Sequence, residues 1–308
     1  MNFLYCFDEN YNIQANISIN SLLEHLETKV DIHIIHKNPL SFSKSLKKIK
    51  KHKNLLNIYI YKFNKSVDFP KLEEAHLSEA TYYRIFISDY LEENIEQLIY
   101  LDADTVVVNN IESELISISK DLNTSDNIIA AKTDMTLSKH SKKLTGNERY
   151  FNAGVMFINY KKWVSNNCQE GLLLKMKEIQ NKIIFWDQDV LNAYFNGQYL
   201  EINDSCNYKV DVDDAKQGKI DIENIKILHY EGKSKPWTVR GASKDNSIYY
   251  QNKYNELFFL PYHISNNWKR QAFDDLRTLY KFNLIKRVKK PVGFTISVIY
   301  FLLKYRDK

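Results

Sequence analysis

Short apolar runs alternate with segments of helical periodicity along the first 160 residues of the chain. Residues 13–26 show the helical pattern best, because Ile17, Leu22, Leu23 and Leu26 fall on one side. Strands and helices in alternation are typical of a mostly parallel, Rossmann-like α/β sheet with helices on both faces. The predicted strands are 3–7, 32–35, 58–61, the run ending at Leu101 and 128–131, and the predicted helices are 13–26, 43–53 and 81–90.

The same alternation continues to about residue 265, with no internal repeat and no convincing linker. Strands are predicted at 151–159 and 225–229, and helices at 172–179 and 187–195. We therefore expect one α/β catalytic domain over residues 1–265, followed by a C-terminal helical tail over residues 266–308.

The composition is that of a globular protein from a reducing compartment. Hydrophobic residues make up 44% and aromatic residues 13% of the 308 residues, which is ample for a core and excludes a disordered chain. Cys6, Cys168 and Cys206 are far apart and in no metal-like spacing, so we expect ordinary thiols. The N-terminus lacks the basic region of a secretory signal, and no run of 18 apolar residues predicts a spanning helix. These features favour a cytoplasmic protein.

Positive charge is concentrated at the C-terminal end. Residues 284–308 contain seven basic residues and one acidic residue, a net charge of +6, whereas the whole chain carries +5. Everything before the tail is therefore close to neutral, which gives nucleic-acid binding over the whole surface little support.

Two acids follow directly after the predicted strand that ends at Leu101. They are Asp102 and Asp104, separated by one residue. Open α/β sheets bind their ligands at the carboxyl ends of strands. Two carboxylates that converge there make a site for a divalent cation of the Mg²⁺ or Mn²⁺ type. A solvated turn is the alternative.

Candidate ligand-binding residues also follow the first strand and occur in the predicted helix 81–90. Asp8 and Asn10 can pair with the edge of a base and Tyr11 can stack on its face, whereas the glycine-rich dinucleotide fingerprint is absent. A helix N-cap by Asp8 or Asn10 is the alternative. Arg84 can bridge carboxylates and a phosphate, or it is an ordinary surface arginine.

Asn152 opens the strand 151–159 and is followed by Ala153 and Gly154. Small residues at the start of a strand indicate that a ligand or another backbone approaches closely, or that the strand contains a bulge. Asn152 itself can bind a sugar hydroxyl.

Polar residues also begin the predicted helix 187–195 and end the late strand. Asp187 and Gln188 suit the recognition of hydroxyl groups, although Asp187 can also be a helix N-cap. His229, with Lys235 close behind it, is a candidate third metal ligand, and a structural histidine is the alternative.

Four motifs in order carry a resemblance to glycosyltransferase family 8, the retaining galactosyl- and glucosyltransferases related to the lipooligosaccharide α-galactosyltransferases. The motifs are Tyr-Leu-Asp-x-Asp at 100–104, Tyr-Phe-Asn-Ala-Gly-Val-x-x-Ile-Asn at 150–159, Asp-Gln-Asp-x-Leu-Asn at 187–192 and His-Tyr-x-Gly-x-x-Lys-Pro-Trp at 229–237. Each motif alone is weak, whereas four in register are specific. The resemblance covers roughly three quarters of the chain.

The resemblance implies a GT-A fold and a UDP-hexose donor held through Mn²⁺, with Mg²⁺ as the alternative cation. It implies that Asp102, Asp104 and His229 bind the metal and that Asn152, Asp187 and Gln188 line the transferred sugar and carry the chemistry. The implied donor-binding residues are Asp8, Asn10, Tyr11, Arg84, Ala103, Asp134, Ala153, Gly232 and Lys235. His76 aligns with a position on the acceptor side. The chain departs from the family pattern at Cys6 and at residues 233–234.

The resemblance also implies transfer with retention of configuration. We favour front-face transfer, in which the leaving phosphate helps to deprotonate the acceptor, over a covalent intermediate on Asp187. The expected acceptor is a cell-surface glycan, a lipid-linked oligosaccharide or a glycoprotein glycan. A nucleotidylyltransferase and a non-catalytic sugar-binding protein are the alternatives, but the first normally has a glycine-rich loop after strand one.

The tail contains a second feature, the mostly apolar run 292–303 with basic residues on both sides. Twelve residues make a helix of about 18 Å, too short to cross a bilayer. We expect reversible attachment to the anionic inner face of the cell membrane through the basic residues and through burial of five apolar side chains. These side chains are Phe294, Ile296, Ile299, Phe301 and Leu302. A helix packed on the catalytic domain is the alternative.

Overall fold

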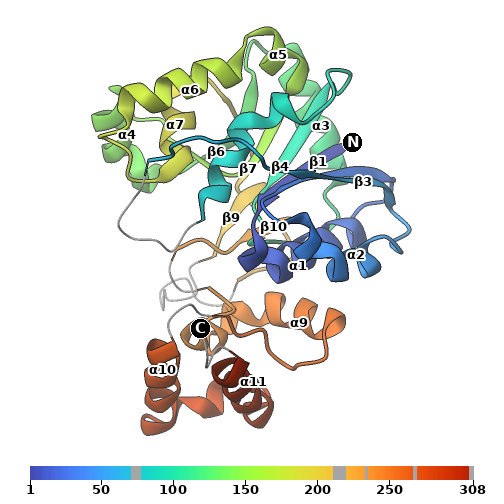
Figure 1. Cartoon of the computed structure of the whole chain (residues 1–308), viewed down its shortest axis with the longest axis vertical. Helices are drawn as coiled ribbons and strands as arrows, with labels where there is room; N and C mark the ends of the chain where they lie inside the picture. The colour runs from blue at the N-terminus through green and yellow to red at the C-terminus, as the bar shows by residue number, and fades with distance from the viewer. Residues whose placement is uncertain (71–77, 211–219, 233–234, 266–268, 305–308) are drawn as a thin grey trace.

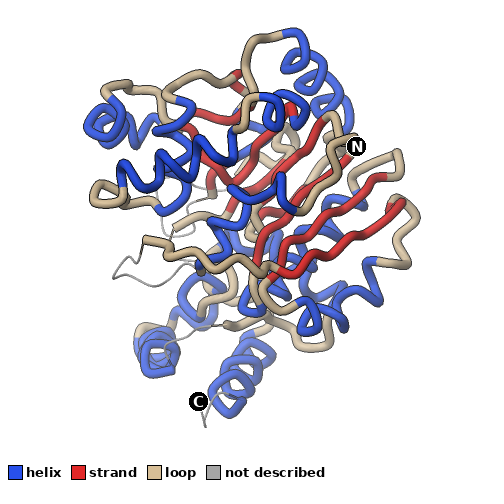
Figure 2. The backbone as a smooth tube through the Cα atoms, turned by 45° about the horizontal axis from the view of Figure 1, so that its top comes forward, coloured by secondary structure: helices blue, strands red, loops and turns tan. Residues whose placement is uncertain are grey.

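The computed structural model describes residues 1–70, 78–210, 220–232, 235–265 and 269–304. Within these ranges a seven-stranded sheet forms the centre of the molecule, with helices on both sides of it (Figures 1 and 2). The strand order is β3-β2-β1-β4-β7-β6-β8. The bounds are β1 (Asn2–Phe7), β2 (Val30–His36), β3 (Leu55–Lys62), β4 (Gln97–Leu101), β6 (Ile129–Thr133), β7 (Phe151–Asn159) and β8 (Leu200–Glu201).

The sheet is mostly parallel, as its sequence pattern predicts. Only β7 runs antiparallel to its neighbours β4 and β6. Strands β1 and β4 pair in parallel, with Leu4 opposite Tyr100. Their carboxyl ends therefore lie at the same edge, so that Asp8 and Asp102 both follow strands at the edge where α/β sheets bind ligands.

Alternate residues of the strands feed two apolar clusters, one on each face. On one face, Phe3 and Tyr5 of β1 pack with helices α1, α2 and α3. On the other face, Leu4 and Cys6 pack with the 3₁₀ helix η3 and with α4 to α7. The bounds are α1 (Asn12–Glu24), α2 (Ser43–Ile49), α3 (Glu112–Thr124), η3 (Glu79–Asp89), α4 (Ser138–Thr145), α5 (Tyr160–Ser165), α6 (Cys168–Ile179) and α7 (Trp186–Phe195).

The segment predicted as a helix over residues 81–90 is a kinked 3₁₀ helix, η3. Its N-cap Ser78 accepts a hydrogen bond from the Ala80 N–H. Six consecutive residues, from Tyr82 to Ile87, are all buried. The segment packs between β1 and helices α6 and α7, so its burial does not follow the one-sided pattern of an amphipathic helix.

A second, three-stranded sheet, which the sequence pattern did not reveal apart from its late strand, lies beside the ligand edge. Its order is β5 (Thr105–Val107), β10 (Ile227–His229) and β9 (Tyr208–Lys209). Strand β5 begins directly after Asp104 and runs antiparallel to β10. The small sheet thus joins the loop after β4 to the late strand that ends in His229.

The C-terminal residues fold into helices that pack against the segment just before them (Figure 1). Phe294 and Phe301 are buried in a cluster with Val239 and Tyr262, which corrects the expectation that these two phenylalanines are free to enter lipid. Over the part of the chain that the structure covers, no helix has the length and apolarity needed to cross a membrane. Helices α8 (Val239–Ala242) and α9 (Ile248–Leu257) precede the tail, which contains α10 (Lys269–Lys281), η7 (Leu284–Arg287) and α11 (Pro291–Lys304). The remaining short 3₁₀ helices of the chain are η1 (Glu9–Tyr11), η2 (Pro39–Phe42), η4 (Met135–Leu137), η5 (Asp204–Asn207) and η6 (Asp245–Ser247).

Candidate active site

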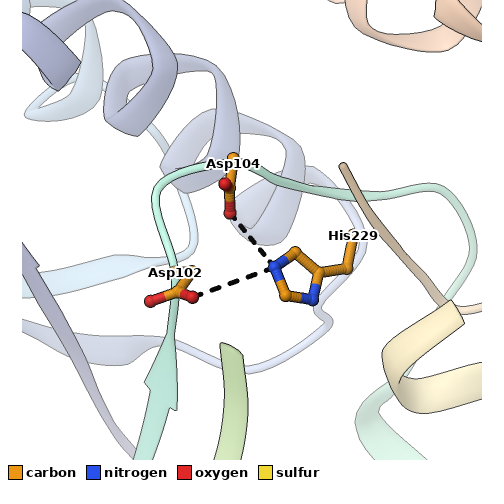
Figure 3. Close-up of side chains that lie close together, drawn as sticks. All are labelled: Asp102, Asp104 and His229. Carbon is orange, nitrogen blue, oxygen red and sulfur yellow. Dashed lines mark ion pairs between the residues drawn. The ribbon is translucent and has the colours of Figure 1, made fainter. Parts of the chain in front are cut away.

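Asp102, Asp104 and His229 converge where β4 and β10 end (Figure 3). The pairing of β10 with β5 places His229 opposite Thr105, one residue after the second acid. His229 Nε2 lies 3.3 Å from Asp104 Oδ1 and 3.8 Å from Asp102 Oδ2. One ligand atom from each of the three residues lies within 4.8 Å of the other two. Two carboxylates and one imidazole at this spacing suit a divalent cation.

Each of the three side chains is held by a further contact through its other polar atom. Tyr100 OH donates to Asp102 Oδ1 at 2.5 Å, and Lys235 Nζ donates to Asp104 Oδ2 at 2.6 Å. The Nδ1 atom of the imidazole lies 3.0 Å from Asn207 Oδ1. Asp104 Oδ1, which faces the cluster, is buried and has no hydrogen bond of good geometry to any residue described. A bound cation would satisfy this oxygen, so the residues fit a metal.

The charges in the cluster stabilise one another. Burial alone would raise the pKa of Asp104, but Lys235 and His229 outweigh it and hold that pKa below its ordinary value. Burial alone would lower the pKa of His229, but Asp104 outweighs it and the pKa is raised. The carboxylate at position 104 is therefore ionised at neutral pH and available to a cation.

The imidazole of His229 packs directly on β7 at Gly154. A Cβ atom at this position would lie 2.1 Å from His229 Cε1. Only glycine allows the strand to pass this close to the ring. The small residues after Asn152 thus allow a close approach, but by the histidine ring rather than by a ligand or a backbone. The irregularity considered as the alternative is present as well, because the pairing of β6 with β7 shifts from Ala131 opposite Met156 to Lys132 opposite Asn152.

Arg84 is buried beneath the acidic loop, so the alternative of a surface arginine is wrong. Its Nε atom forms an ion pair with Asp187, and its Nη1 atom donates to the Ala153 carbonyl at 2.6 Å. Nη1 also lies 3.5 Å from Asp102 Oδ1. The guanidinium thus links the acidic loop, the start of β7 and the start of α7.

Gln188 lies beside this arginine with its amide fixed at both ends. Its Oε1 atom accepts from the Ala153 N–H at 2.9 Å, and its Nε2 atom lies 3.4 Å from Tyr150 OH. Asp187 is not the N-cap of α7, because the cap position is Phe185 and no side chain caps the helix there. Asp189 instead accepts hydrogen bonds from the backbone N–H groups of Ile184 and Phe185.

Asn152 connects the metal cluster to the start of β7 and to Glu231. Its Oδ1 atom accepts from the Gly154 N–H at 2.9 Å and from Asn207 Nδ2 at 3.0 Å. Its Nδ2 atom donates to Glu231 Oε2 at 2.9 Å, and Glu231 Oε1 lies 2.6 Å from Lys209 Nζ. A continuous polar network therefore runs from the imidazole to the opening of β7.

The chain matches a known protein-family model over most of its length. The family model "Glycosyl transferase family 8" matches residues 2–240, more than three quarters of the chain. The chain belongs to glycosyl transferase family 8. The resemblance carried by the four motifs is confirmed, and the protein is a glycosyltransferase.

Known members of family 8 resemble the chain over most of its length. A lipopolysaccharide 1,2-glucosyltransferase of Escherichia coli is 28% identical over 272 residues, which cover 82% of this chain and 78% of that protein. A lipopolysaccharide 1,3-galactosyltransferase of Salmonella typhimurium is 28% identical over 281 residues, with the same coverage. Among solved structures, the galactosyltransferase LgtC in complex with donor and acceptor sugar analogues superposes with a TM-score of 0.68 at 20% identity. That likeness covers 88% of this chain and 100% of LgtC, and it confirms the GT-A fold.

The family 8 residues expected to hold the nucleotide lie at the end of β1. Asp8 accepts a hydrogen bond from the Asn10 N–H at 2.9 Å, so the capping role considered as an alternative is present. The ring of Tyr11 packs edge-to-face against Trp237, with ring centroids 6.1 Å apart. Since Trp237 follows Lys235 by two residues, the first strand and the last motif meet at one place.

The remaining predicted residues are more scattered. Ala103 is buried in the apolar cluster between β4 and α1. Asp134 caps η4 by accepting from the Thr136 N–H at 2.9 Å, and its Oδ2 atom lies 3.6 Å from Lys209 Nζ. Gly232 has a left-handed backbone with φ of 79°. His76 lies outside the described residues.

Sequence reasoning missed two residues that touch the metal cluster. Tyr100 precedes Asp102 by two positions, so strand alternation could have placed both on one side. Asn207 gave no such signal, because it belongs to the short turn η5 and meets His229 only through the fold.

Proposed function

We propose that the protein is a retaining hexosyltransferase that moves galactose or glucose from a UDP-sugar to a glycan acceptor with the help of Mn²⁺. The convergence of Asp102, Asp104 and His229 in a family 8 chain is the observation that carries this proposal. A histidine ligand favours Mn²⁺ over Mg²⁺, which prefers oxygen ligands. The lipopolysaccharide glycosyltransferases among the relatives support a cell-surface glycan, lipid-linked oligosaccharide or glycoprotein glycan as the acceptor class.

The proposed chemistry uses residues on both sides of the metal cluster. A cation held by Asp102, Asp104 and His229 would neutralise charge that develops on the leaving diphosphate. Lys235, whose ammonium already lies beside Asp104, would add a second positive charge there. Asn152 and Gln188 would hold the sugar, since both present amide groups at the start of β7 and α7.

The environment of Asp187 supports front-face transfer. Its carboxylate is buried and ion-paired with Arg84, so it is poorly placed to serve as a free nucleophile beneath the sugar. We therefore assign Asp187 the role of holding Arg84, and through it the Ala153 carbonyl, in position. Proton transfer from the acceptor then falls to the leaving phosphate.

The donor assay that tests the proposal measures UDP release from a panel of UDP-hexoses with Mn²⁺ and with EDTA. We expect release from UDP-galactose or UDP-glucose that depends on the metal. Proton NMR of the first product should show the small anomeric coupling of an α-glycoside. A β-linked product, or full activity in EDTA, would contradict the proposal.

A matched variant separates sugar binding from nucleotide binding. Gln188→Ala removes the amide next to Ala153 and should lower the rate of transfer while leaving UDP affinity unchanged. A nucleotide-binding protein without transferase activity would bind UDP in both forms and release none from the sugar donors.

We further propose that the tail attaches the enzyme to the anionic inner face of the cell membrane. Helix α11 leaves Val292, Ile296, Ile299 and Leu303 exposed, and these residues recur at helical spacing on one side. Lys289, Lys290 and Lys304 flank this stripe. The division at residue 265 between a catalytic domain and this tail is part of the same proposal.

A further inference from the structure

One buried amide, that of Asn207, lies between the candidate metal ligand His229 and the candidate sugar ligand Asn152. Asn207 is 5% exposed. Its Oδ1 atom lies 3.0 Å from His229 Nδ1, and its Nδ2 atom lies 3.0 Å from Asn152 Oδ1. Asn207 lies in none of the four motifs and is not among the metal- and sugar-binding residues that the family resemblance implies.

The network fixes which atom of each side chain is donor and which is acceptor. The Gly154 N–H is a donor, so the atom of Asn152 that it meets at 2.9 Å must be the acceptor Oδ1. Asn207 therefore presents its NH₂ group to that oxygen, and its own Oδ1 atom to His229. The imidazole must then carry its hydrogen on Nδ1.

This tautomer has a direct consequence for the metal cluster. With the hydrogen on Nδ1, Nε2 is the atom left to bind a cation, and it lies on the side of the ring that faces Asp102 and Asp104. Metal-binding histidines usually donate their other N–H to a fixed acceptor, which sets the tautomer and the ring orientation. Asn207 is placed to be that acceptor.

The turn that carries Asn207 is itself well fixed. Asn203 caps η5 by accepting from the Ser205 N–H, and Cys206 is fully buried. The Lys226 N–H donates to the Ser205 carbonyl at 2.9 Å, which ties the turn to the segment before β10. The amide at position 207 is thus held in place by the backbone rather than by its own contacts alone.

We propose that Asn207 is a positioning residue that sets His229 for metal binding and couples the metal site to Asn152 on the sugar side. The proposal rests on the proposed function, in which His229 binds Mn²⁺. It predicts that a change at Asn152, which contacts none of the three ligands, is felt at the metal through Asn207.

Two substitutions at this position separate the roles of its two polar atoms. Asn207→Ala removes both contacts, so Mn²⁺ affinity should fall by about 10- to 100-fold, the usual effect of losing such a partner. Asn207→Asp keeps an oxygen for the His229 Nδ1–H but opposes a second oxygen to Asn152 Oδ1. Its Mn²⁺ affinity should fall about as far as that of Asn152→Ala, and by clearly less than that of Asn207→Ala, since the histidine keeps its acceptor.

The experiment titrates the full chain with Mn²⁺, alone and again with UDP, and follows free Mn²⁺ by electron paramagnetic resonance. Asn94→Ala is the control, because it removes an exposed amide that contacts neither His229 nor Asn152. Thermal unfolding of each variant shows whether it is folded. The control should bind Mn²⁺ like the native protein.

A double-mutant cycle tests the coupling. Asn152→Ala should weaken Mn²⁺ binding by itself, and adding it to Asn207→Ala should weaken binding by less than it does alone. The path through Asn207 is then already broken, and only the bond of Asn152 to the Gly154 N–H is left to lose. Additive losses, an unchanged affinity in Asn207→Ala, or an Asn207→Asp as weak as the alanine variant would overturn the proposal. A native protein that binds no Mn²⁺ with or without UDP would overturn the proposed function itself.

Discussion

At the scale of single residues, Asp104 offers the sharpest test of the metal site. Its Oδ1 atom is buried and faces the cluster, and its Oδ2 atom binds Lys235. Asp104→Asn keeps the shape but removes the negative charge, so kcat should fall by about 100-fold or more, the scale of losing one preorganised charge-stabilising group. UDP binding should also lose most of its dependence on Mn²⁺, as measured by calorimetry with and without the metal.

The control for this substitution is Asp121→Asn, an exposed acid on α3 that is remote from the cluster in the fold. It should leave kcat and UDP binding unchanged. If Asp104→Asn retained more than a third of the native kcat with intact Mn²⁺ dependence, Asp104 would not be a metal ligand.

The residues of the site divide into those that the sequence reveals and those that only the fold reveals. Asp102, Asp104 and His229 stand in recognisable motifs, so the sequence predicts a cluster that the structure brings together. Asn207 lies 22 positions before His229 in an unmarked turn. A hydrogen-bond partner of this kind depends on how two segments pack, and no spacing rule records it.

At the scale of secondary structure, the position of β7 against β10 depends on Gly154. In Gly154→Ala the new Cβ atom would lie 2.1 Å from the His229 ring, which Asn207 holds through Nδ1. The ring must therefore move, and overpacking of this kind costs about 1 to 3 kcal/mol. We expect Mn²⁺ affinity to fall by about tenfold or more, measured by the same titration of free Mn²⁺.

Gly146→Ala is the comparison for this prediction. Gly146 ends α4 with φ of 81°, and no atom lies within 4 Å of a Cβ added there. The substitution strains the backbone and should cost about 1 kcal/mol of stability without touching the metal cluster. Equal Mn²⁺ affinities in the two alanine variants would show that the ring tolerates the methyl group.

The junction between α9 and the tail should make stability depend on pH. The His263 Nδ1 atom forms a hydrogen bond with Tyr250 OH at 2.6 Å, and the imidazole ring stacks on the ring of Trp237. Burial, reinforced by Lys304, lowers the pKa of His263 to about 3. As the pH falls, His263 of the unfolded chain binds a proton before His263 of the folded protein does. The stability that the neutral histidine contributes is therefore intact above about pH 6.5 and is lost as the pH falls towards 3.

Between pH 7 and pH 5 this single histidine should cost the native protein up to about 2 kcal/mol of unfolding free energy. His263→Gln cannot titrate in this range, so its urea unfolding should lose less stability over the same interval. Buried His33, whose pKa is lowered to about 4, contributes equally to both proteins. An identical pH dependence of the two proteins would exclude His263 as the source.

Elements were predicted well where one apolar pattern dominates and poorly where packing overrides it. Strand β7 has the predicted bounds, β1 begins one residue earlier than predicted, and β4 ends at Leu101 as predicted. The three-residue strand β5 was missed, because so short a segment carries no period of its own. Helix α3 was also missed, although Leu115, Ile118 and Leu122 give it an apolar face at helical spacing.

At the scale of the whole molecule, helix α11 of the tail has one buried face and one exposed face. Phe294, Val298 and Phe301 of α11 are buried against the catalytic part, so removing the tail would uncover apolar surface. The opposite stripe, with Ile296, Ile299 and Leu303, remains about half exposed. Truncation after residue 283 therefore mixes two effects, and substitutions in the exposed stripe test membrane attachment more cleanly.

The combined variant Ile296→Glu, Ile299→Glu and Leu303→Glu should lose binding to anionic liposomes. It replaces apolar side chains that would enter the interface with charges that an anionic surface repels, while basic flanking residues worth about 1 kcal/mol each remain. Cosedimentation with vesicles measures the loss, and UDP-hexose hydrolysis should be unchanged. Leu174→Glu is the control, since Leu174 on α6 is 61% exposed, as is Leu303. If the stripe variant still sediments with anionic vesicles like the control, or if the native protein binds neutral vesicles as tightly, the exposed face of α11 does not attach the enzyme to the membrane.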